Sequence, residues 1–148
     1  MQITMALVAE AANRSENGRL NLLGVFHTLH AVTTPCQHPM MALVISFEAT
    51  AMERGTRQKV GIKLVNADGK PVFALPDSEL EVPADPTAIT PQLNMIANMA
   101  GIQFENYGSY QFEIHIEGEL AGRVPLRLVP PPQQNMTWTT KPPLPPSF

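Results

Sequence analysis

The 148-residue sequence contains little charge and a single cysteine. Asp, Glu, Lys and Arg make up 16% of the chain, below the roughly one quarter that is usual in globular proteins. Exposed helices are normally rich in Lys and Glu, so this shortage, together with 15 prolines, predicts little surface helix. A single cysteine forms no internal disulfide, and the fold therefore does not depend on an oxidising compartment.

The sequence also shows no basic stripe and no membrane span, and we expect its N-terminal segment not to be a leader. Its 13 acidic and 10 basic residues are spread along the chain, whereas nucleic-acid-binding proteins usually concentrate basic residues on one face. No stretch approaches the ~20 apolar residues of a membrane helix. The N-terminal segment has no basic start, and Glu10 interrupts its apolar run. We therefore predict a cytoplasmic protein that binds neither nucleic acid nor membrane.

Alternation of apolar and polar residues dominates the sequence and predicts β-strands. The clearest case is YQFEIHIEGELAGRVPLRLV, residues 110–129, in which two alternating runs flank a turn near Gly118. This pattern predicts a hairpin with one buried face. Pro125 lacks an N–H, which places its strand at a sheet edge or at a bulge.

Turn residues predict two further hairpins. Residues 66–69, Asn-Ala-Asp-Gly, separate two apolar runs within residues 59–75, and Asn17-Gly18 separates residues 3–9 from residues 19–26. MMALVISFEA, residues 40–49, is apolar on both faces and predicts a buried central strand. A helix is the alternative for residues 4–12 and 91–100; we interpret both as strands because their neighbours have strand character.

About eight short strands are thus expected, as in a β-sandwich or a β-barrel. In ENYGSYQF, Gly108 precedes Tyr110 by two positions and Tyr110 precedes Phe112 by two. This is the spacing of a tyrosine corner at the start of the penultimate strand, although an ordinary strand tyrosine is the alternative. We predict an all-β, immunoglobulin-like antiparallel sandwich of about 7–9 strands over residues 1–129. The Tyr110 hydroxyl should donate to backbone between Ile102 and Glu105.

Three stretches resemble a bacterial family of small uncharacterised proteins, a domain-of-unknown-function group with an ITMALVAEAAN-like N-terminus. They are MQITMALVAEAANRSENGRLNLLGVFHTL, HPMMALVISFEA and FENYGSYQFEIHIEGELAGRVPLRLVP. The resemblance covers most of residues 1–130. It implies a small cytoplasmic β protein and transfers no catalytic residue.

Residues 26–38, FHTLHAVTTPCQH, contain four possible zinc ligands: His27, His30, Cys36 and His38. His27 and His30 differ by three positions, so they would point to opposite faces of a strand. The set also matches no standard ligand spacing. We expect a strand over residues 27–32, then a proline-bounded loop, and neither a metal nor another cofactor. A small ligand- or metal-binding domain that uses this loop is the alternative.

Catalytic signatures are missing. Cys36 has His38 nearby but no motif that would make it a nucleophile. His115, Glu117 and Glu119 are interpreted as solvated residues on a strand and its turn. There is no Walker loop, no G-x-G-x-x-G and no G-x-S-x-G. We predict that the protein is not an enzyme; a small enzyme that uses His115 or Cys36 is the remaining alternative.

Several methionines have strand spacing, which favours a place in the core over an adaptable binding surface. They are Met40, Met41, Met95 and Met99.

Residues 130–148 differ from the rest, since they hold seven of the 15 prolines. Proline-rich segments favour an extended polyproline II conformation, and a disordered terminus is the usual outcome. Trp138, Met136 and Phe148 nevertheless supply apolar anchors. We therefore predict a docking arm whose interaction residues are Met136, Trp138, Pro142, Pro143, Leu144, Pro145, Pro146 and Phe148. The expected function is a non-enzymatic interaction or structural module that forms a homo-oligomer or docks a protein partner through this arm.

Overall fold

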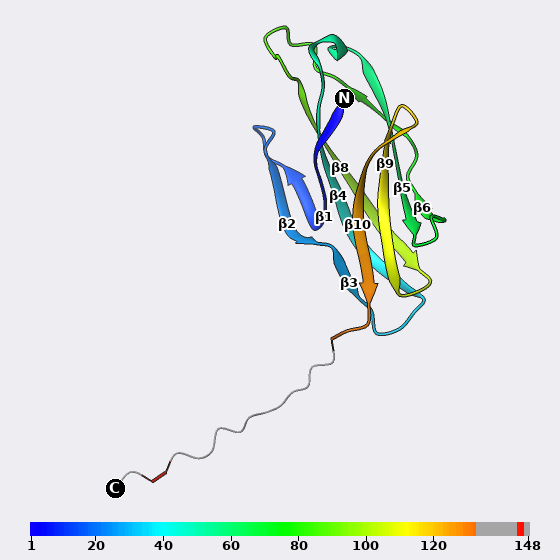
Figure 1. Ribbon diagram of the computed structural model, residues 1–148. Helices are drawn as coiled ribbons and strands as arrows, with labels where there is room; N and C mark the ends of the chain where they lie inside the picture. The colour runs from blue at the N-terminus through cyan, green and yellow to red at the C-terminus, as the bar shows by residue number, and fades with distance from the viewer. Residues whose placement is uncertain (133–144, 147–148) are drawn as a thin grey trace.

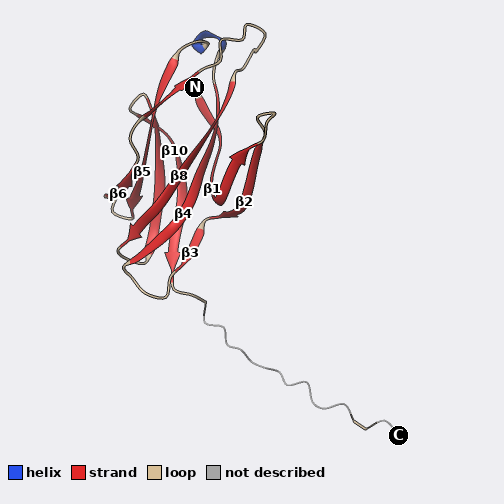
Figure 2. Ribbon diagram, turned by 180° about the vertical axis from the view of Figure 1, so that it is seen from behind, coloured by secondary structure: helices blue, strands red, loops and turns tan. Residues whose placement is uncertain are grey.

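Two β-sheets make up the residues that the computed structural model describes, 1–132 and 145–146. Sheet A has the order β2-β1-β4-β8 and contains β1 (Gln2–Arg14), β2 (Leu20–Phe26), β4 (Cys36–Glu48) and β8 (Gln92–Phe104). Sheet B has the order β3-β10-β9-β5-β6, with β7 paired to β5; its strands are β3 (Thr28–His30), β5 (Arg57–Asn66), β6 (Pro71–Ala74), β7 (Ser78–Glu81), β9 (Gly108–Ile116) and β10 (Glu119–Val129). Figures 1 and 2 show the two sheets from opposite sides. The all-β prediction is confirmed.

The strand inventory departs from expectation in two ways. Strands β1 to β10 exceed the expected seven to nine because short strands such as β3 contain too few residues to show alternation. The pair β3–β10 is parallel, so the expectation of a wholly antiparallel arrangement is wrong there. No helix among the described residues is long and apolar enough to cross a membrane.

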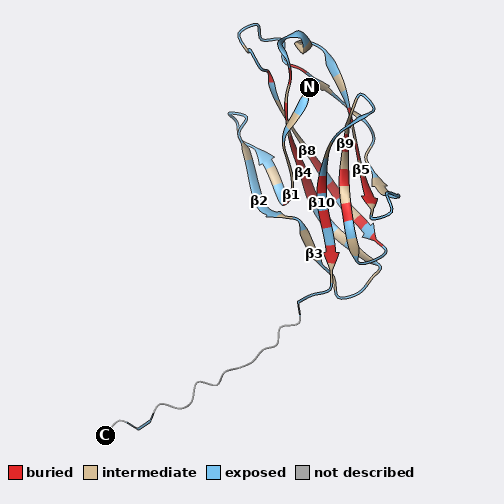
Figure 3. Cartoon of the chain, viewed as in Figure 1, coloured by how far each residue is buried: buried red, intermediate tan, exposed pale blue. Residues whose placement is uncertain are grey.

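The core lies between the two sheets and contains side chains from both. Its largest fully buried side chains include Phe47, Phe104 and Phe112. Figure 3 shows buried segments in β4, β5, β9 and β10, which lie mainly in the C-terminal half of β5 and β10. Along β9 the predicted alternation holds, because Tyr110, Phe112 and Ile114 are buried while the residues between them are partly exposed.

All three predicted hairpins are present: β1–β2, β5–β6 and β9–β10. In the β5–β6 turn, the Asn66 side chain accepts hydrogen bonds from the backbone N–H groups of Asp68 and Lys70, at 3.0 and 2.9 Å. Gly69 completes this turn with a φ of 78°, in the left-handed region that glycine adopts most readily. Residues 40–48 lie in β4, one of the two inner strands of sheet A, and Ala49 follows its last residue, so the predicted central strand is present.

The prediction of a proline-bounded loop is wrong at the C-terminal end of that loop, because β4 already begins at Cys36. Cys36 pairs with Phe104, and His38 pairs with Ile102. Pro39 is tolerated within β4 because it faces Gly101, where the ladder skips one pair. The strand expected over residues 27–32 is shorter than predicted, since only Thr28–His30 form a strand, β3, after the chain has left sheet A and joined sheet B.

Pro125 lies where β10 is locally an edge. β3 covers only Arg127–Val129 of β10, and the Arg127 N–H donates to the His27 carbonyl at 2.9 Å. Alternate residues of a strand turn their nitrogen to the same side, so the nitrogen of Pro125 faces the side on which β3 has not yet begun. The missing N–H therefore costs no ladder hydrogen bond, in agreement with the prediction.

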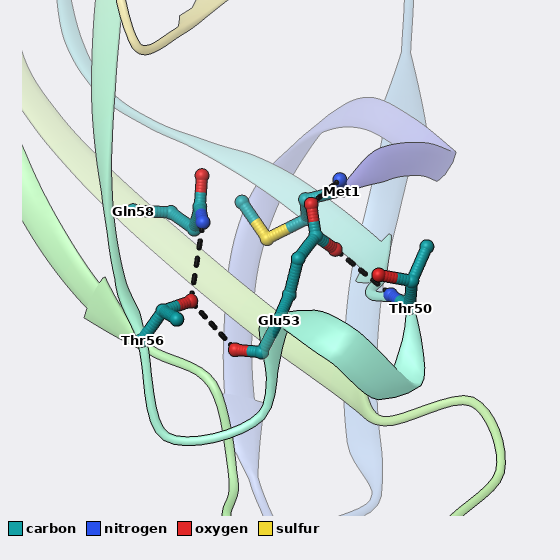
Figure 4. Close-up of polar contacts among 5 residues, drawn as sticks. All are labelled: Met1, Thr50, Glu53, Thr56 and Gln58. Carbon is teal, nitrogen blue, oxygen red and sulfur yellow. Dashed lines mark hydrogen bonds and ion pairs between the residues drawn. The ribbon is translucent and has the colours of Figure 1, made fainter.

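One polar cluster fixes the connection between β4 and β5 (Figure 4). It surrounds Glu53, in the single 3-10 turn η1 (Ala51–Glu53). The Glu53 carboxylate accepts from the amino group of Met1 at 2.5 Å and from the Thr50 N–H at 2.8 Å. These two bonds, in that order, lower the pKa of Glu53. The Thr56 hydroxyl donates to the Glu53 carbonyl at 2.6 Å, and the Gln58 amide donates to the Thr56 hydroxyl at 3.2 Å.

Candidate interaction site

β1 pairs with two neighbouring strands, one after the other. Gln2–Ala9 pairs with β4, whereas Val8–Arg14 pairs with β2. Figure 1 shows that the second half of β1 turns back, beside β2, toward the end of the molecule at which the chain starts. Residues 10–14 and 20–26 therefore form a two-stranded ribbon, called here the β1–β2 ribbon.

The two faces of the β1–β2 ribbon differ in charge. The register places Ala11 opposite Leu23 and Asn13 opposite Asn21, and the Asn21 amide donates to the Asn13 side chain at 2.9 Å. One face thus carries no charge from end to end; its residues are Ala9, Ala11, Asn13, Asn21, Leu23 and Val25. The other face carries Glu10 and Arg14. The Glu10 side chain lies over Gly24, where a Cβ atom would come within 2.8 Å of it.

β2 leaves apolar side chains in solvent. Leu23 is 68% exposed and Val25 58%, and Leu22 on the other face is 36% exposed. No residue from Leu20 to Phe26 is charged, and one edge of β2 has no strand partner among the described residues. Natural edge strands are usually protected against pairing by Lys, Pro, a bulge or a covering loop. The β2 edge has no charge or proline to protect it, although its backbone is irregular at Gly24, which has a φ of 66°.

β8 ends sheet A on the other side and is arranged differently. The Arg14 guanidinium donates to the Asn94 carbonyl, and the Gln37 amide donates to the Gly101 carbonyl at 3.2 Å. Gly101 has a φ of 67°, which interrupts the extended conformation of the strand. β2 has a comparable irregularity at Gly24, with a φ of 66°, so the side-chain capping is what distinguishes β8, and it hinders pairing with another strand.

The four possible zinc ligands, for which no metal was expected, do not converge. His27 lies between β2 and β3, His30 is exposed at the end of β3, and Cys36 is partly buried at the start of β4. The His38 ring contacts that of Phe26, with centroids 6.1 Å apart. Within residues 1–132 and 145–146, no three His, Cys, Asp or Glu side chains form a group that could hold a metal ion.

His115 is less solvated than expected. Its side chain is 25% exposed, and its Nε2 lies 3.3 Å from the Glu113 carboxylate, which is also 3.3 Å from the Lys63 ammonium. Burial raises the pKa of Glu113, but the hydrogen bonds and charges of His115 and Lys63 outweigh it and the net pKa is lowered. The expectation of a free surface histidine is therefore wrong.

A shallow groove of about 290 Å³ adjoins His115 on sheet B, with Gly61 and Asp77 in its lining. The charged groups that line it are paired: the Lys59 ammonium lies 3.2 Å from the Asp77 carboxylate. Glu117, expected to be solvated, accepts the Lys59 N–H at 2.6 Å. The groove thus offers a ligand few unengaged charges.

The Tyr110 hydroxyl donates to the Asn106 carbonyl at 2.6 Å. The predicted range, from Ile102 to Glu105, is wrong by one residue, because β8 extends to Phe104 and the acceptor lies in the turn that follows. The Tyr110 ring meets Phe104 edge to face, with centroids 5.0 Å apart. Gly108 opens β9, and Phe112 is fully buried in the same strand.

The methionines divide between core and surface. Met41 and Met99 are buried as predicted, Met95 is half-buried, and Met40 is 58% exposed, so its assignment to the core is wrong. Six predicted arm residues lie outside the described residues: Met136, Trp138, Pro142, Pro143, Leu144 and Phe148. Pro145 and Pro146 are described and exposed.

The sequence interpretation missed the exposed residues of β2, although it predicted the strand. A usable signal was present, because the neighbours Leu22 and Leu23 are both apolar. Successive strand residues point to opposite faces, so this pair requires apolar cover on both sides. The ribbon lacks that cover.

A family model described as a family of unknown function, DUF6941, matches residues 4–129. The chain belongs to the DUF6941 family. The match extends to the last residue of β10. The recognition of a domain-of-unknown-function family in the sequence is thereby confirmed. No curated protein matches this DUF6941 chain.

The DUF6941 fold is similar to part of a solved structure of Pseudomonas fluorescens alkylpurine DNA glycosylase AlkC bound to DNA containing an abasic site analog. The TM-score is 0.51 and the sequence identity is 14%, with 86% of this chain and 30% of that chain covered. At this identity the likeness concerns the fold alone. This chain spans less than a third of the length of the glycosylase.

Proposed function

We propose that this DUF6941 domain is a non-enzymatic interaction module with an immunoglobulin-like β-sandwich fold. It acts in the bacterial cytoplasm and associates with itself or docks a protein partner. The order of strands within the two sheets supports the immunoglobulin-like assignment, as does the Tyr110 hydrogen bond at the start of the penultimate strand.

One observation carries the proposal: β2 is an uncharged edge strand with exposed apolar side chains. An exposed strand edge presents a row of unpaired N–H and C=O groups, which a second polypeptide can satisfy as an added strand. A two-stranded ribbon alone is at best marginally stable in water. Pairing along β2 would give the ribbon a third strand and cover one flank of the Leu23 and Val25 side chains.

The charge of the chain supports a protein partner rather than a nucleic acid. The similar glycosylase is bound to DNA, but this chain has 13 acidic and 10 basic residues, with a formal net charge of −3. DNA binding normally requires basic side chains that neutralise phosphates. β2 itself contains none.

The test compares the full-length wild type with Leu23→Lys and with Asn98→Lys. Asn98 is exposed in mid-strand on β8, so its substitution is a matched control on the protected edge. Native mass by light scattering and the proteins retained from an extract of the source organism would be measured for all three. We expect Leu23→Lys to lose an association that the control keeps. If neither mass nor retained proteins depend on Leu23, the proposal is wrong.

The proposal also includes the C-terminal arm, residues 130–148, as a docking segment, and the support for this part comes from the sequence alone. Trp138 is the natural anchor, because an indole buries a large apolar area and its N–H can find an acceptor in a partner surface. Deletion of residues 130–148 should reduce native mass or thermal stability, and Trp138→Ala should reproduce most of that loss. If both variants match the wild type in both measurements, the arm has no docking role.

A further inference from the structure

We infer that the occupant of the free β2 edge is a second copy of this chain, paired antiparallel about a two-fold axis that passes through Leu23. This inference rests on the proposed function and names the partner. It would join two four-stranded sheets A edge to edge into one continuous sheet.

The length and composition of β2 favour pairing with itself. The strand has seven residues, and Leu23 is its centre. A two-fold axis at this residue places Leu23 opposite Leu23 and Leu20 opposite Phe26 of the other copy. Apolar pairs directly opposite each other stabilise antiparallel strands, whereas like charges would destabilise them. Since β2 contains no charge, self-pairing creates no such repulsion.

The ribbon surface next to the edge has the composition of an interface centre. The face that contains Leu23 holds only Ala, Asn, Leu and Val side chains from β1 and β2. Charged residues are depleted at the centre of protein interfaces. The two ribbon charges lie on the opposite face, where the Glu10 side chain lies over Gly24 and the Arg14 guanidinium donates to the Asn94 carbonyl of β8. The two-fold pairing therefore gives Leu23 an apolar neighbour across the two strands and brings no charge onto that face.

β8 is a poorer occupant of the β2 edge than a second β2. Both strands contain one glycine with a left-handed φ, Gly24 in β2 and Gly101 in β8, but two carbonyls of β8, those of Asn94 and Gly101, are already bonded to side chains. A head-to-tail assembly through β2 and β8 would also leave one edge open at each end and grow without limit. The symmetric β2–β2 pair closes on itself and predicts a dimer.

A charge-exchange experiment tests this arrangement in the full-length protein. Leu23→Lys and Leu23→Glu each place two like charges on the two-fold axis, so each variant alone should be monomeric, with self-association weakened by more than about tenfold. An equimolar mixture should restore the dimer mass, because Lys then faces Glu. Asn98→Lys should dimerise like the wild type. Leu23 is exposed, and unchanged circular dichroism would show that each variant is folded.

Light scattering across a range of protein concentrations measures the native mass of each variant and of the mixture. A wild-type dimer that Leu23→Lys abolishes and the mixture restores supports the inference. A wild-type monomer at every concentration overturns it, as does a Leu23→Lys dimer or a mixture that stays monomeric. If the wild type is monomeric but still retains another protein through β2, the inference fails and the proposed function stands. If β2-dependent binding is also missing, both fail.

Discussion

The two edges of sheet A differ in what their apolar residues contact. Neither β2 nor β8 contains a charged residue. In β8, however, Met99, Ile102 and Phe104 point into the core, and exposed positions such as Asn98 are polar. In β2, the residues Leu22, Leu23 and Val25 are exposed. A lack of charge therefore marks an interface only where the same strand also fails to bury its apolar side chains.

The largest expected effect separates the two edges by stability. Phe104→Ala on β8 should lower the free energy of unfolding by about 3–5 kcal/mol, because it leaves a cavity in a closely packed core. Leu23→Ala on β2 should change the stability of the monomer by no more than about 0.5 kcal/mol. Urea denaturation at low protein concentration measures both. Equal effects of the two substitutions would show that β2 packs on its own domain.

A smaller effect is expected where β8 passes into β9. Tyr110→Phe removes the hydrogen bond to Asn106 while keeping the ring that meets Phe104. We expect a loss of about 1–3 kcal/mol, since the acceptor would be left without its partner in a partly buried place. Thermal and urea unfolding would check this. An unchanged unfolding curve would show that the Tyr110 hydroxyl does not stabilise this turn.

Acid should have a modest effect on stability through the outer face of sheet B. Charged side chains are paired on that face, whereas β2 contains no charged residue. The pKa of Glu113 is lowered from its usual 4.5, so its ionised form is favoured in the folded state. This contribution to stability is present above pH 4.5 and is lost as the pH falls through the lowered value. Glu113→Gln should therefore lose less stability than the wild type on acidification. Parallel pH dependences of the melting temperature would contradict this.

The smallest effect is expected from salt. Association through an uncharged strand has no ion pairs for salt to screen. The dissociation constant of the wild-type dimer should stay within about twofold between low and moderate sodium chloride, whereas that of the Leu23→Lys and Leu23→Glu mixture should rise. Analytical ultracentrifugation at several salt concentrations distinguishes the two. A strong salt dependence of the wild type would point to charged groups outside β2.

The sequence contained most of the strand positions, because alternation in residues 110–129 and the turns at Gly18 and Gly69 are local signals. The start of β4 was missed for a non-local reason. Pro35 and Pro39 indicate a loop, but the pairing of Cys36 with Phe104 and of His38 with Ile102 determines the structure. Pairing between strands that are far apart in the sequence produces no local sequence pattern.

The candidate site was harder to predict for the same reason. In the sequence, Leu22 and Leu23 look like other apolar strand residues, because their exposure depends on the order of strands in the sheet. From the sequence, Glu117 is interpreted as solvated because its partner, the Lys59 N–H, lies on β5. His115 contacts Glu113 of its own strand, and Glu113 in turn pairs with Lys63 on β5. Edge position and side-chain partners depend on which strands meet, and this is decided by the packing of the whole domain rather than by spacing along the chain.

The short link between β2 and β3 has a consequence for valency. β2 continues through His27 into β3, where His30 lies beside Val129, the last residue before the arm. In a dimer with its axis at Leu23, each arm starts seven positions from the axis, at most roughly 23 Å away at ~3.3 Å per residue. The two arms would therefore leave from opposite sides of the axis, at most roughly 45 Å apart. Only a partner with two binding sites at that separation would gain avidity from both.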